Sequence, residues 1–363
     1  MPLFALGFRP FYLLAGAYAA LSVPLWSLQY SGWLPGANIL WHAHEMLFGY
    51  AFAVIAGFLL TAVRAWTGRP TPTGGVLAAM AALWVMARVL AFHSLLVSSI
   101  VDMLFAIGVA AGIGVPIVAS RNRNWFFIVL VLALGGCSLL FQAYPGTGLA
   151  LGLDVVLFVV AVMAGRVVPS FTNNAIPGAG AKRIAWLEYA ALGSILALLF
   201  QDLFGIEYPL TALAAAILHA ARLALWAPLK TRGRPILWIL HLSYAWIVVH
   251  LALRGLAGFN LVAAAIPTHA LTVGAIGGIT LGMMTRTGRG HTGRPLDTGR
   301  AELAAYVLVQ AAAATRVLLP LVAPGAYVEL VMASGVLWTA AFLIFTVAYY
   351  PILSRPRLDG QPG

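Results

Sequence analysis

Two histidines and a carboxylate stand within four residues of one another in the segment Trp41-His42-Ala43-His44-Glu45. Imidazole nitrogens bind transition metals, and they also hold haem iron. On a helix, residues i and i+2 point about 200° apart, so His42 and His44 face different neighbours. We therefore predict two ligand roles, or one ligand and one supporting side chain. Glu45 beside them is the candidate for handling protons.

The rest of the chain must position these residues inside a membrane. Of 363 residues, 62% are hydrophobic and only 9% are charged. A soluble domain is roughly half apolar and about a quarter charged, so the composition excludes a soluble enzyme, a disordered chain and a disulfide scaffold. The single cysteine, Cys137, forms no intrachain disulfide and no metal site built from cysteine pairs. We predict an all-α polytopic membrane protein.

Charges, prolines and glycines divide the chain into twelve apolar stretches, each long enough to span a bilayer. The connections between them are short, so we expect a single transmembrane domain over 1–363. The predicted spans are 11–30, 39–63, 75–94, 98–119, 125–144, 148–168, 184–203, 208–228, 236–254, 260–284, 302–322 and 327–350.

The basic residues test this count. With the N-terminus in the cytoplasm, all but four of the 21 lysines and arginines fall on the cytoplasmic side. The exceptions are Arg88, Arg222, Arg254 and Arg316. We therefore expect a multi-pass membrane protein with both termini in the cytoplasm. The formal charge of +11 then reflects topology in the lipid bilayer, and it requires no nucleic acid partner.

Histidines are the commonest ionisable residues inside the predicted spans, where such groups are costly and mark function. This profile favours metal or haem ligation over a proton-coupled carrier, which depends on buried carboxylates. For His219 and His250, a hydrogen bond to a neighbouring helix is an equally good account, and His93 sits at a span end. The span histidines are His42, His44, His93, His219, His241, His250 and His269, and the few carboxylates are Glu45, Asp102, Asp154 and Glu188.

The second and tenth spans align without gaps, and the alignment pairs His44 with His269. The distance from histidine to proline is the same in both, from His44 to Pro70 and from His269 to Pro295. Each helix also carries small residues at spacing four, a pattern that allows close helix contact. The aligned glycines are Gly49 with Gly274 and Gly57 with Gly282.

The alignment suggests a cofactor held between like-oriented helices. We predict His44 and His269 as the axial ligands of a haem, because each lies at a similar depth on the face away from the glycines. Spans that correspond at an interval of eight fit three four-helix units, which is the pseudo-threefold architecture of haem–copper oxidases. This step rests on analogy of fold.

A histidine and a tyrosine share one face of the ninth span, since His241 and Tyr244 are three residues apart. The pair suits a metal with a redox or proton partner, and the alternative is a Tyr–His hydrogen bond between helices. Arg88 and Arg254 lie toward the outer ends of their spans. They either extend to the interface or pair with haem propionates through the planar guanidinium.

These motifs together resemble the NnrS family of membrane proteins, and the resemblance runs along nearly the whole chain. It implies twelve spans that hold haem, expected as b-type, and copper, in a bacterial protein of the nitric oxide response and denitrification. The family motifs contain His42, His44, His241, His269 and His291, which the resemblance implies as metal ligands. The matching segments are Gly7–Phe11, Trp41–Tyr50, Ala56–Thr61, Gly165–Thr172, His241 with Tyr244 and Trp246, His269–Gly274, Met284–Arg286 and Gly290–Arg294.

We expect a haem–copper protein that binds or reduces nitric oxide or another small diatomic molecule. If it is an enzyme, it is a haem-dependent oxidoreductase in which Glu45 and Tyr244 take part, with an electron donor that the sequence does not identify. The alternative is a transporter for copper or another small solute. In that case the histidines near Glu45 and methionines such as Met46 act as transient soft ligands.

Overall fold

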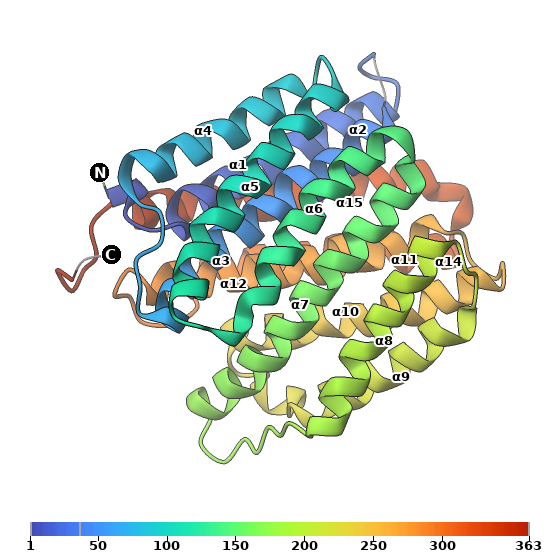
Figure 1. The fold of residues 1–363 in the computed structure, drawn as a ribbon. Coiled ribbons are helices and arrows are strands. Elements are labelled where there is room, and N and C mark those ends of the chain that lie inside the picture. Colours follow the sequence, from blue (N-terminus) through green and yellow to red (C-terminus); the bar gives the residue numbers. More distant parts are fainter. Residues whose placement is uncertain (1, 36–37, 362–363) are drawn as a thin grey trace. The chain divides into compact units, whose positions relative to one another are not determined.

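The computed structural model describes residues 2–35 and 38–361, and within these residues it contains helices and no strand (Figure 1). Every predicted span coincides with a helical segment. The segments are α1 (Phe8–Tyr30), α2 (Ile39–His44) with the π-helix η2 (Glu45–Ala51) and α3 (Phe52–Thr67), α4 (Gly74–Leu90), α5 (Leu95–Ala119), α6 (Phe126–Ala143), α7 (Pro145–Ala175), α8 (Ala185–Phe204), α9 (Pro209–Leu225), α10 (Pro235–Gly258), α11 (Ala265–His269) with the π-helix η5 (Ala270–Gly277) and α12 (Gly278–Gly290), α13 (Arg300–Val317) with α14 (Leu319–Val322), and α15 (Tyr327–Ser354).

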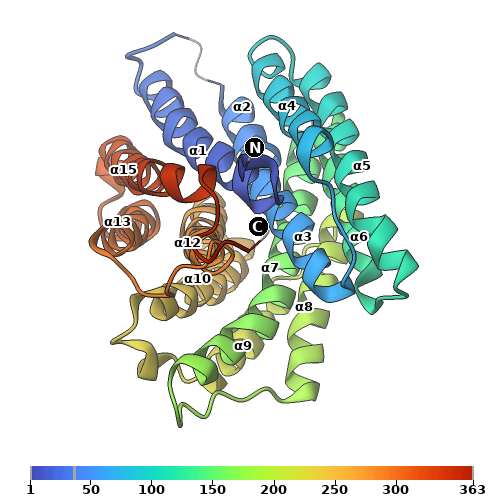
Figure 2. The ribbon, with the colours of Figure 1, turned by 90° about the vertical axis from the view of Figure 1, so that its left-hand side faces the viewer.

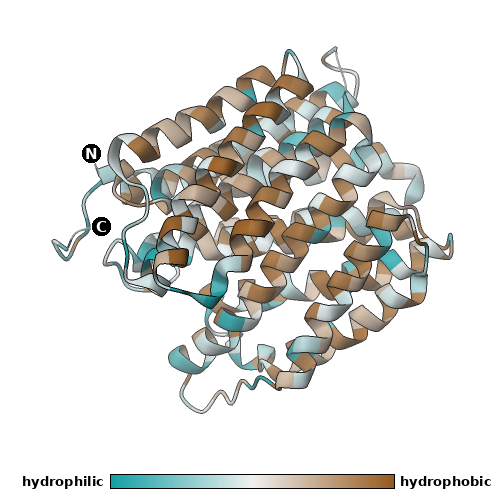
Figure 3. Cartoon of the chain, in the orientation of Figure 1, coloured by the Kyte–Doolittle hydropathy of each residue, from teal (hydrophilic) through white to brown (hydrophobic). Residues whose placement is uncertain are grey.

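Ten of these segments, among the residues described, are long and apolar enough to cross a membrane, and α4 and α9 are shorter apolar helices. Hydrophilic residues gather toward the helix ends and loops (Figure 3). The predicted class, an all-α polytopic membrane protein, is confirmed. The pseudo-threefold arrangement stays a prediction.

The chain divides into two compact units. The first contains 1–155, 284–296 and 345–363, and the second contains 156–283 and 297–344. Helices α7, α12 and α15 each contribute residues to both units. The single transmembrane domain expected from the sequence stays a prediction.

In the first unit, α5 packs against α4 and α6, and α1 packs against η2 and α3. The two ends of the chain meet here, since Arg9 Nη1 donates to the carbonyls of Leu353 (2.9 Å) and Arg355 (2.7 Å). Figures 1 and 2 show the N- and C-terminal ends at the same end of this unit. A chain with an even number of spans brings its two ends to the same side, so this arrangement agrees with the even number predicted from the sequence.

In the second unit, α10 packs against α9, α11 and η5, and α13 packs against η5. The helix that contains η5 approaches α10 closely along its glycines. A Cβ atom on Gly282 would lie 2.9 Å from Leu240 Cδ2, as a Cβ on Gly57 would lie 2.9 Å from Phe11 Cβ in the first unit. The close packing predicted from the small residues is confirmed, because neither position has room for a methyl group.

The alignment of the second and tenth spans extends to the backbone. Both helices change from α to π directly after the aligned histidine, at Glu45 and at Ala270. Segments of π-helix are rare and concentrate at functional sites. The turns after the two helices also match, since the aligned Gly68 and Gly293 both have left-handed φ values, 66° and 73°. The two helices thus share a local structure as well as a pattern.

Candidate functional site

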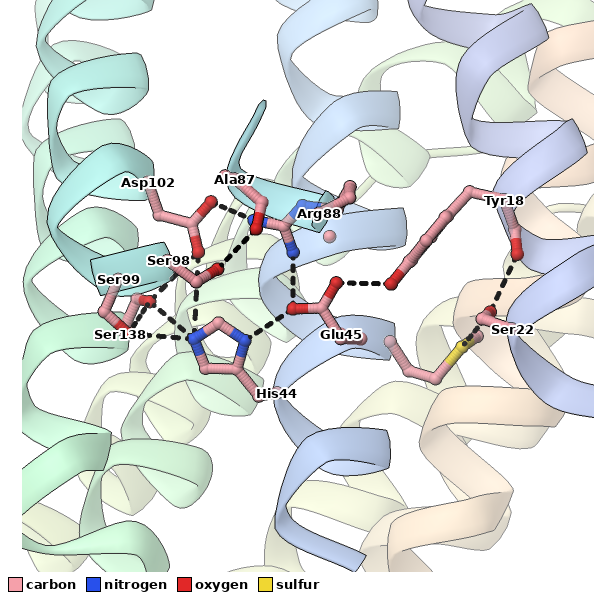
Figure 4. A network of polar contacts seen from close by, with 12 residues as sticks. Tyr18, Ser22, His44, Glu45, Ala87, Arg88, Ser98, Ser99, Asp102 and Ser138 are labelled. Atoms are coloured by element: carbon pink, nitrogen blue, oxygen red, sulfur yellow. Dashed lines mark hydrogen bonds and ion pairs between the residues drawn. The ribbon is translucent and has the colours of Figure 1, made fainter. Parts of the chain in front are cut away.

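His44 is fully buried at the end of α2, and both of its ring nitrogens are engaged (Figure 4). Nδ1 lies 2.8 Å from Glu45 Oε1, and Nε2 lies 2.9 Å from Ser99 Oγ and 3.0 Å from Ser138 Oγ. An ionised carboxylate only accepts hydrogen bonds, so the network assigns the proton to Nδ1. Nε2 then accepts from the serine hydroxyls of α5 and α6.

The two carboxylates beside His44 share one arginine. Arg88 Nη1 donates to Glu45 Oε1 at 2.8 Å, and Arg88 Nη2 donates to Asp102 Oδ1. The Tyr18 hydroxyl donates to the other oxygen of Glu45. Ser138 Oγ lies 3.2 Å from Asp102 Oδ2, so the hydrogen bonds form a continuous path from Tyr18 to Asp102 (Figure 4). We call these residues, with His44, Ser99 and Ser138, the His44 network.

The charges of the His44 network do not cancel when His44 is neutral. Glu45 and Asp102 are fully buried and Arg88 is 4% exposed, so two carboxylates face one guanidinium in a buried region. Uncompensated charge is expensive in such a place. Protonation of His44 brings the sum to zero, and Nε2 is 3.7 Å from Asp102 Oδ2. With both carboxylates ionised, the His44 network therefore reaches zero net charge by taking up one proton.

Local sequence explains how Arg88 reaches this position from the last turn of α4. Gly49 on η2 leaves space for the guanidinium, since a Cβ there would lie 2.7 Å from Arg88 Nη1. The indole of Trp84, one turn earlier on α4, donates to the Gly49 carbonyl at 3.1 Å. Gly49, which belongs to the small-residue pattern, therefore leaves room for the Arg88 side chain as well as for the close approach of α1.

His42 faces a different neighbour, as its spacing from His44 predicts. Its ring stacks on Trp26 of α1, with centroids 4.1 Å apart and planes at 22°. His44 points instead to α5 and α6. The roles predicted for His42 as a metal or haem ligand stay predictions.

A second buried polar cluster, in the second unit, surrounds Tyr244. The Tyr244 hydroxyl lies 2.6 Å from His219 Nδ1 and accepts from Arg222 Nη1 at 2.8 Å. Arg222 also donates to both oxygens of Glu188, at 2.9 and 2.6 Å. His219 Nε2 donates to the Ala191 carbonyl (3.0 Å), so Nδ1 accepts a hydrogen bond from the Tyr244 hydroxyl. Arg183 Nη2, on a half-exposed side chain, also lies 3.4 Å from Glu188 Oε2, so two cations approach the single carboxylate of this cluster.

Tyr244 therefore forms the Tyr–His hydrogen bond between helices that was the alternative at this position, with His219 as the partner. His241 makes a separate set of contacts. Its Nδ1 donates to the Leu237 carbonyl (3.1 Å), and its Nε2 lies 3.3 Å from both Trp226 O and Thr172 Oγ1. The sequence did not predict that His219, Arg222 and Glu188 lie together. The signal that could have indicated it is the presence of Arg222 and Glu188 inside spans that contain few charged residues.

His269 has the hydrogen bonding of a ligand. Its ring is half-buried, and Nδ1 donates to the Ala265 carbonyl at 2.6 Å, which leaves the Nε2 lone pair for another partner. Metal-bound histidines are fixed by such an outer hydrogen bond. His291 lies beyond the end of α12, 5.6 Å from the Phe8 ring. Burial, followed by the charge of Arg357, lowers the pKa of the His291 imidazole.

The two arginines predicted for propionates both pair with carboxylates of the chain. Arg88 contacts Glu45 and Asp102, and Arg254 Nη2 lies 2.6 Å from Asp202 Oδ1, with both side chains 23% exposed. Their pairing with a cofactor stays a prediction.

The predicted histidine ligands differ in how well their surroundings would allow them to bind a metal or a haem. Across residues 2–35 and 38–361, no group of three or more His, Cys, Asp or Glu side chains is arranged to hold a metal ion. His44 would have to give up its serine contacts to bind iron through Nε2, whereas His269 has Nε2 ready. Axial ligation by His44 and His269 stays a prediction, better supported for His269.

Comparison with known proteins adds the family. A search of curated proteins finds no match to this chain. The family model described as NnrS protein matches residues 2–357, nearly the whole chain. The resemblance seen in the histidine motifs is thereby confirmed, and the chain belongs to the NnrS family.

Proposed function

We propose that this chain is a haem- and copper-containing membrane protein that binds nitric oxide, and that the His44 network handles protons for it. Membership of the NnrS family supports a membrane protein of the nitric oxide response. The structural observation that carries the proton role is the imbalance of two buried carboxylates against one arginine around His44.

His44 moves a proton between defined atoms in this proposal. The neutral ring holds its proton on Nδ1 and donates it in a hydrogen bond to Glu45. When a second proton binds to Nε2, the new N–H donates a hydrogen bond to the hydroxyl of Ser99 or Ser138. Ser138 connects this position to Asp102. Arg88 stays charged and anchors both carboxylates, which keeps the path rigid.

His269 is the residue that best fits a haem, because Nε2 is open and Nδ1 is fixed by the Ala265 carbonyl. When bound, the haem and copper supply the redox-active metals to which nitric oxide binds. The chain supplies ligands, apolar walls and a proton path. We further propose the bacterial inner membrane as the location, with both termini in the cytoplasm, because most basic residues fall on that side.

Optical spectroscopy of the detergent-purified protein tests the proposal. We expect a Soret band in protein made with added haem, a shift of that band on anaerobic addition of nitric oxide, and copper by elemental analysis. Protein that shows neither the band nor copper under these conditions would contradict the assignment.

A proton-coupled transporter of copper or another small solute is the second candidate. The buried Glu45, Asp102 and Arg88 favour it, because carriers use such carboxylates to couple solute movement to protons. Uptake by proteoliposomes under an imposed pH gradient, with protein that carries no haem, would support the transporter. The absence of any gradient-driven uptake would count against it.

A further inference from the structure

The helices around His269 repeat the arrangement around His44 with one chemical difference. In each unit a π-helix follows the histidine, and an arginine stands in the last turn of a nearby helix. Arg88 occupies this place on α4, and Arg316 occupies it on α13. Helix α13 packs on α11 and η5.

Arg316 is buried but only partly satisfied. Its side chain is 6% exposed. Nη2 donates to the Tyr327 hydroxyl at 2.9 Å, and the guanidinium lies 5.0 Å from the centre of that ring. Nη1 is buried and has no hydrogen-bond partner in the part of the chain that the structure describes. Buried donors in proteins are almost always paired, so this one calls for an explanation.

The difference lies in the counter-ions. Arg88 is neutralised by Glu45, the residue after His44, and by Asp102 on the next helix. The residue after His269 is Ala270, and the partner of Arg316 on its next helix is Tyr327. Within residues 2–35 and 38–361, Arg316 therefore has no carboxylate partner. The second arrangement keeps the arginine and lacks both acids.

A second buried polar atom on these helices also lacks a partner. His250 on α10 is 5% exposed, and its Nδ1 donates to the Pro267 carbonyl of α11 at 2.8 Å. Its Nε2 is unpartnered among the described residues. Both atoms lie on helices that pack against α11.

We propose that Arg316 binds the carboxylate-type group of a ligand, an anion with two oxygens such as a carboxylate or nitrite, which takes the place held by Glu45 and Asp102 beside Arg88. A buried guanidinium without a counter-charge is unfavourable, and a carboxylate matches its planar donors. The anion arrives either free or as the acid group of a bound cofactor. A free anion makes this site independent of the proposed function, whereas an acid group of the cofactor makes it rest on the proposed haem.

Thermal unfolding and calorimetry of the purified protein, with formate and nitrite as probes at constant ionic strength, test the site. We expect both anions to raise the midpoint of the wild-type protein. Arg316→Gln should weaken binding about tenfold or more, as the loss of a charge-assisted hydrogen bond predicts. Arg232→Gln removes an exposed arginine of the loop before α10 and should leave binding unchanged.

Tyr327→Asp restores the acid found beside Arg88, so it should abolish formate binding in a protein that still folds. The source is decided by comparing haem-loaded with haem-free protein. A response in both indicates a free anion. A response only in haem-free protein, with low haem retention in Arg316→Gln, indicates an acid group of the cofactor. Equal binding by wild type, Arg316→Gln and Tyr327→Asp would overturn the proposal. So would the absence of any response together with normal haem retention in Arg316→Gln.

Discussion

His44 donates a hydrogen bond from Nδ1 to the carboxylate of Glu45, its immediate neighbour in the chain, at 2.8 Å. Adjacent residues on an α-helix normally face different directions, and here the second of the two begins a π-helix. The bond fixes the tautomer of His44 and turns Nε2 toward α5 and α6. A local irregularity of the backbone thus coincides with the orientation of the residue at the centre of the network.

The proton capacity of the His44 network is open to measurement. In His44→Gln the polar contacts can persist, but the side chain cannot take up a proton. We expect the variant to bind one proton fewer than the wild-type protein on acidification. The measurement is a potentiometric titration of both proteins in detergent. Identical proton uptake would show that His44 does not carry the exchangeable proton.

Arg88 should be essential for stability. In Arg88→Gln, Glu45 and Asp102 remain buried without their cation, and breaking such a buried pair costs about 3–5 kcal/mol of unfolding free energy. Adding Asp102→Asn removes one of the two stranded charges and should restore part of the loss. Denaturant unfolding in a fixed detergent measures both. A double variant no more stable than the single one would argue against charge imbalance as the cause.

Gly165 on α7 should not tolerate a methyl group. A Cβ there would collide with the Arg222 guanidinium that holds Glu188, and overpacking of this kind costs about 1–3 kcal/mol. Gly193 on α8 has no neighbour within 4 Å of its added Cβ, so Gly193→Ala should change stability by about 1 kcal/mol or less. Thermal midpoints of the two variants provide the comparison. Equal effects would mean that the space beside Arg222 is not limiting.

The Tyr244–His219 contact predicts coupling between two helices. Tyr244→Phe leaves His219 Nδ1 buried without its donor, and we expect a loss of about 1–3 kcal/mol. Tyr244→Phe should cost much less in a protein that already carries His219→Phe. A double-mutant cycle of unfolding free energies measures this coupling. Additive losses would show that the hydrogen bond contributes nothing of its own.

His269 is the position at which haem binding should be most sensitive. His269→Ala removes the open Nε2, and we expect most of the Soret absorbance to be lost at equal protein expression. Thr268→Ala is the control, because the neighbouring hydroxyl only bonds back to the Ala264 carbonyl at 3.1 Å. Haem content and spin state that are unchanged in His269→Ala would reject this residue as an axial ligand.

Four of the seven residues of the His44 network could be singled out from the sequence. His44, Glu45 and Arg88 stood out because ionisable side chains are rare in these spans, and Asp102 was among the few carboxylates. Ser99 and Ser138 were not found, because serine is ordinary in membrane helices, where small residues let helices pack closely. They lie 55 and 94 residues from His44 along the chain. A helical spacing relates only residues within a few turns of one another, so it cannot predict these contacts.

The pairing of Tyr244 shows a second limit. A separation of three residues places His241 and Tyr244 on similar faces of α10, but it does not say which helix lies opposite. The structure brings α9 there, with His219 and Arg222. By contrast, the ten long helical segments of the described residues were predictable, since each one follows from about 20 consecutive apolar residues.

The two π-helices bear on the alignment of the second and tenth spans. Segments of π-helix are rare, and the described residues have one directly behind each of the two aligned histidines. The backbone therefore supports the alignment independently of the side chains. The shared irregularity also does not depend on an acid after the histidine, because Glu45 follows His44 whereas Ala270 follows His269.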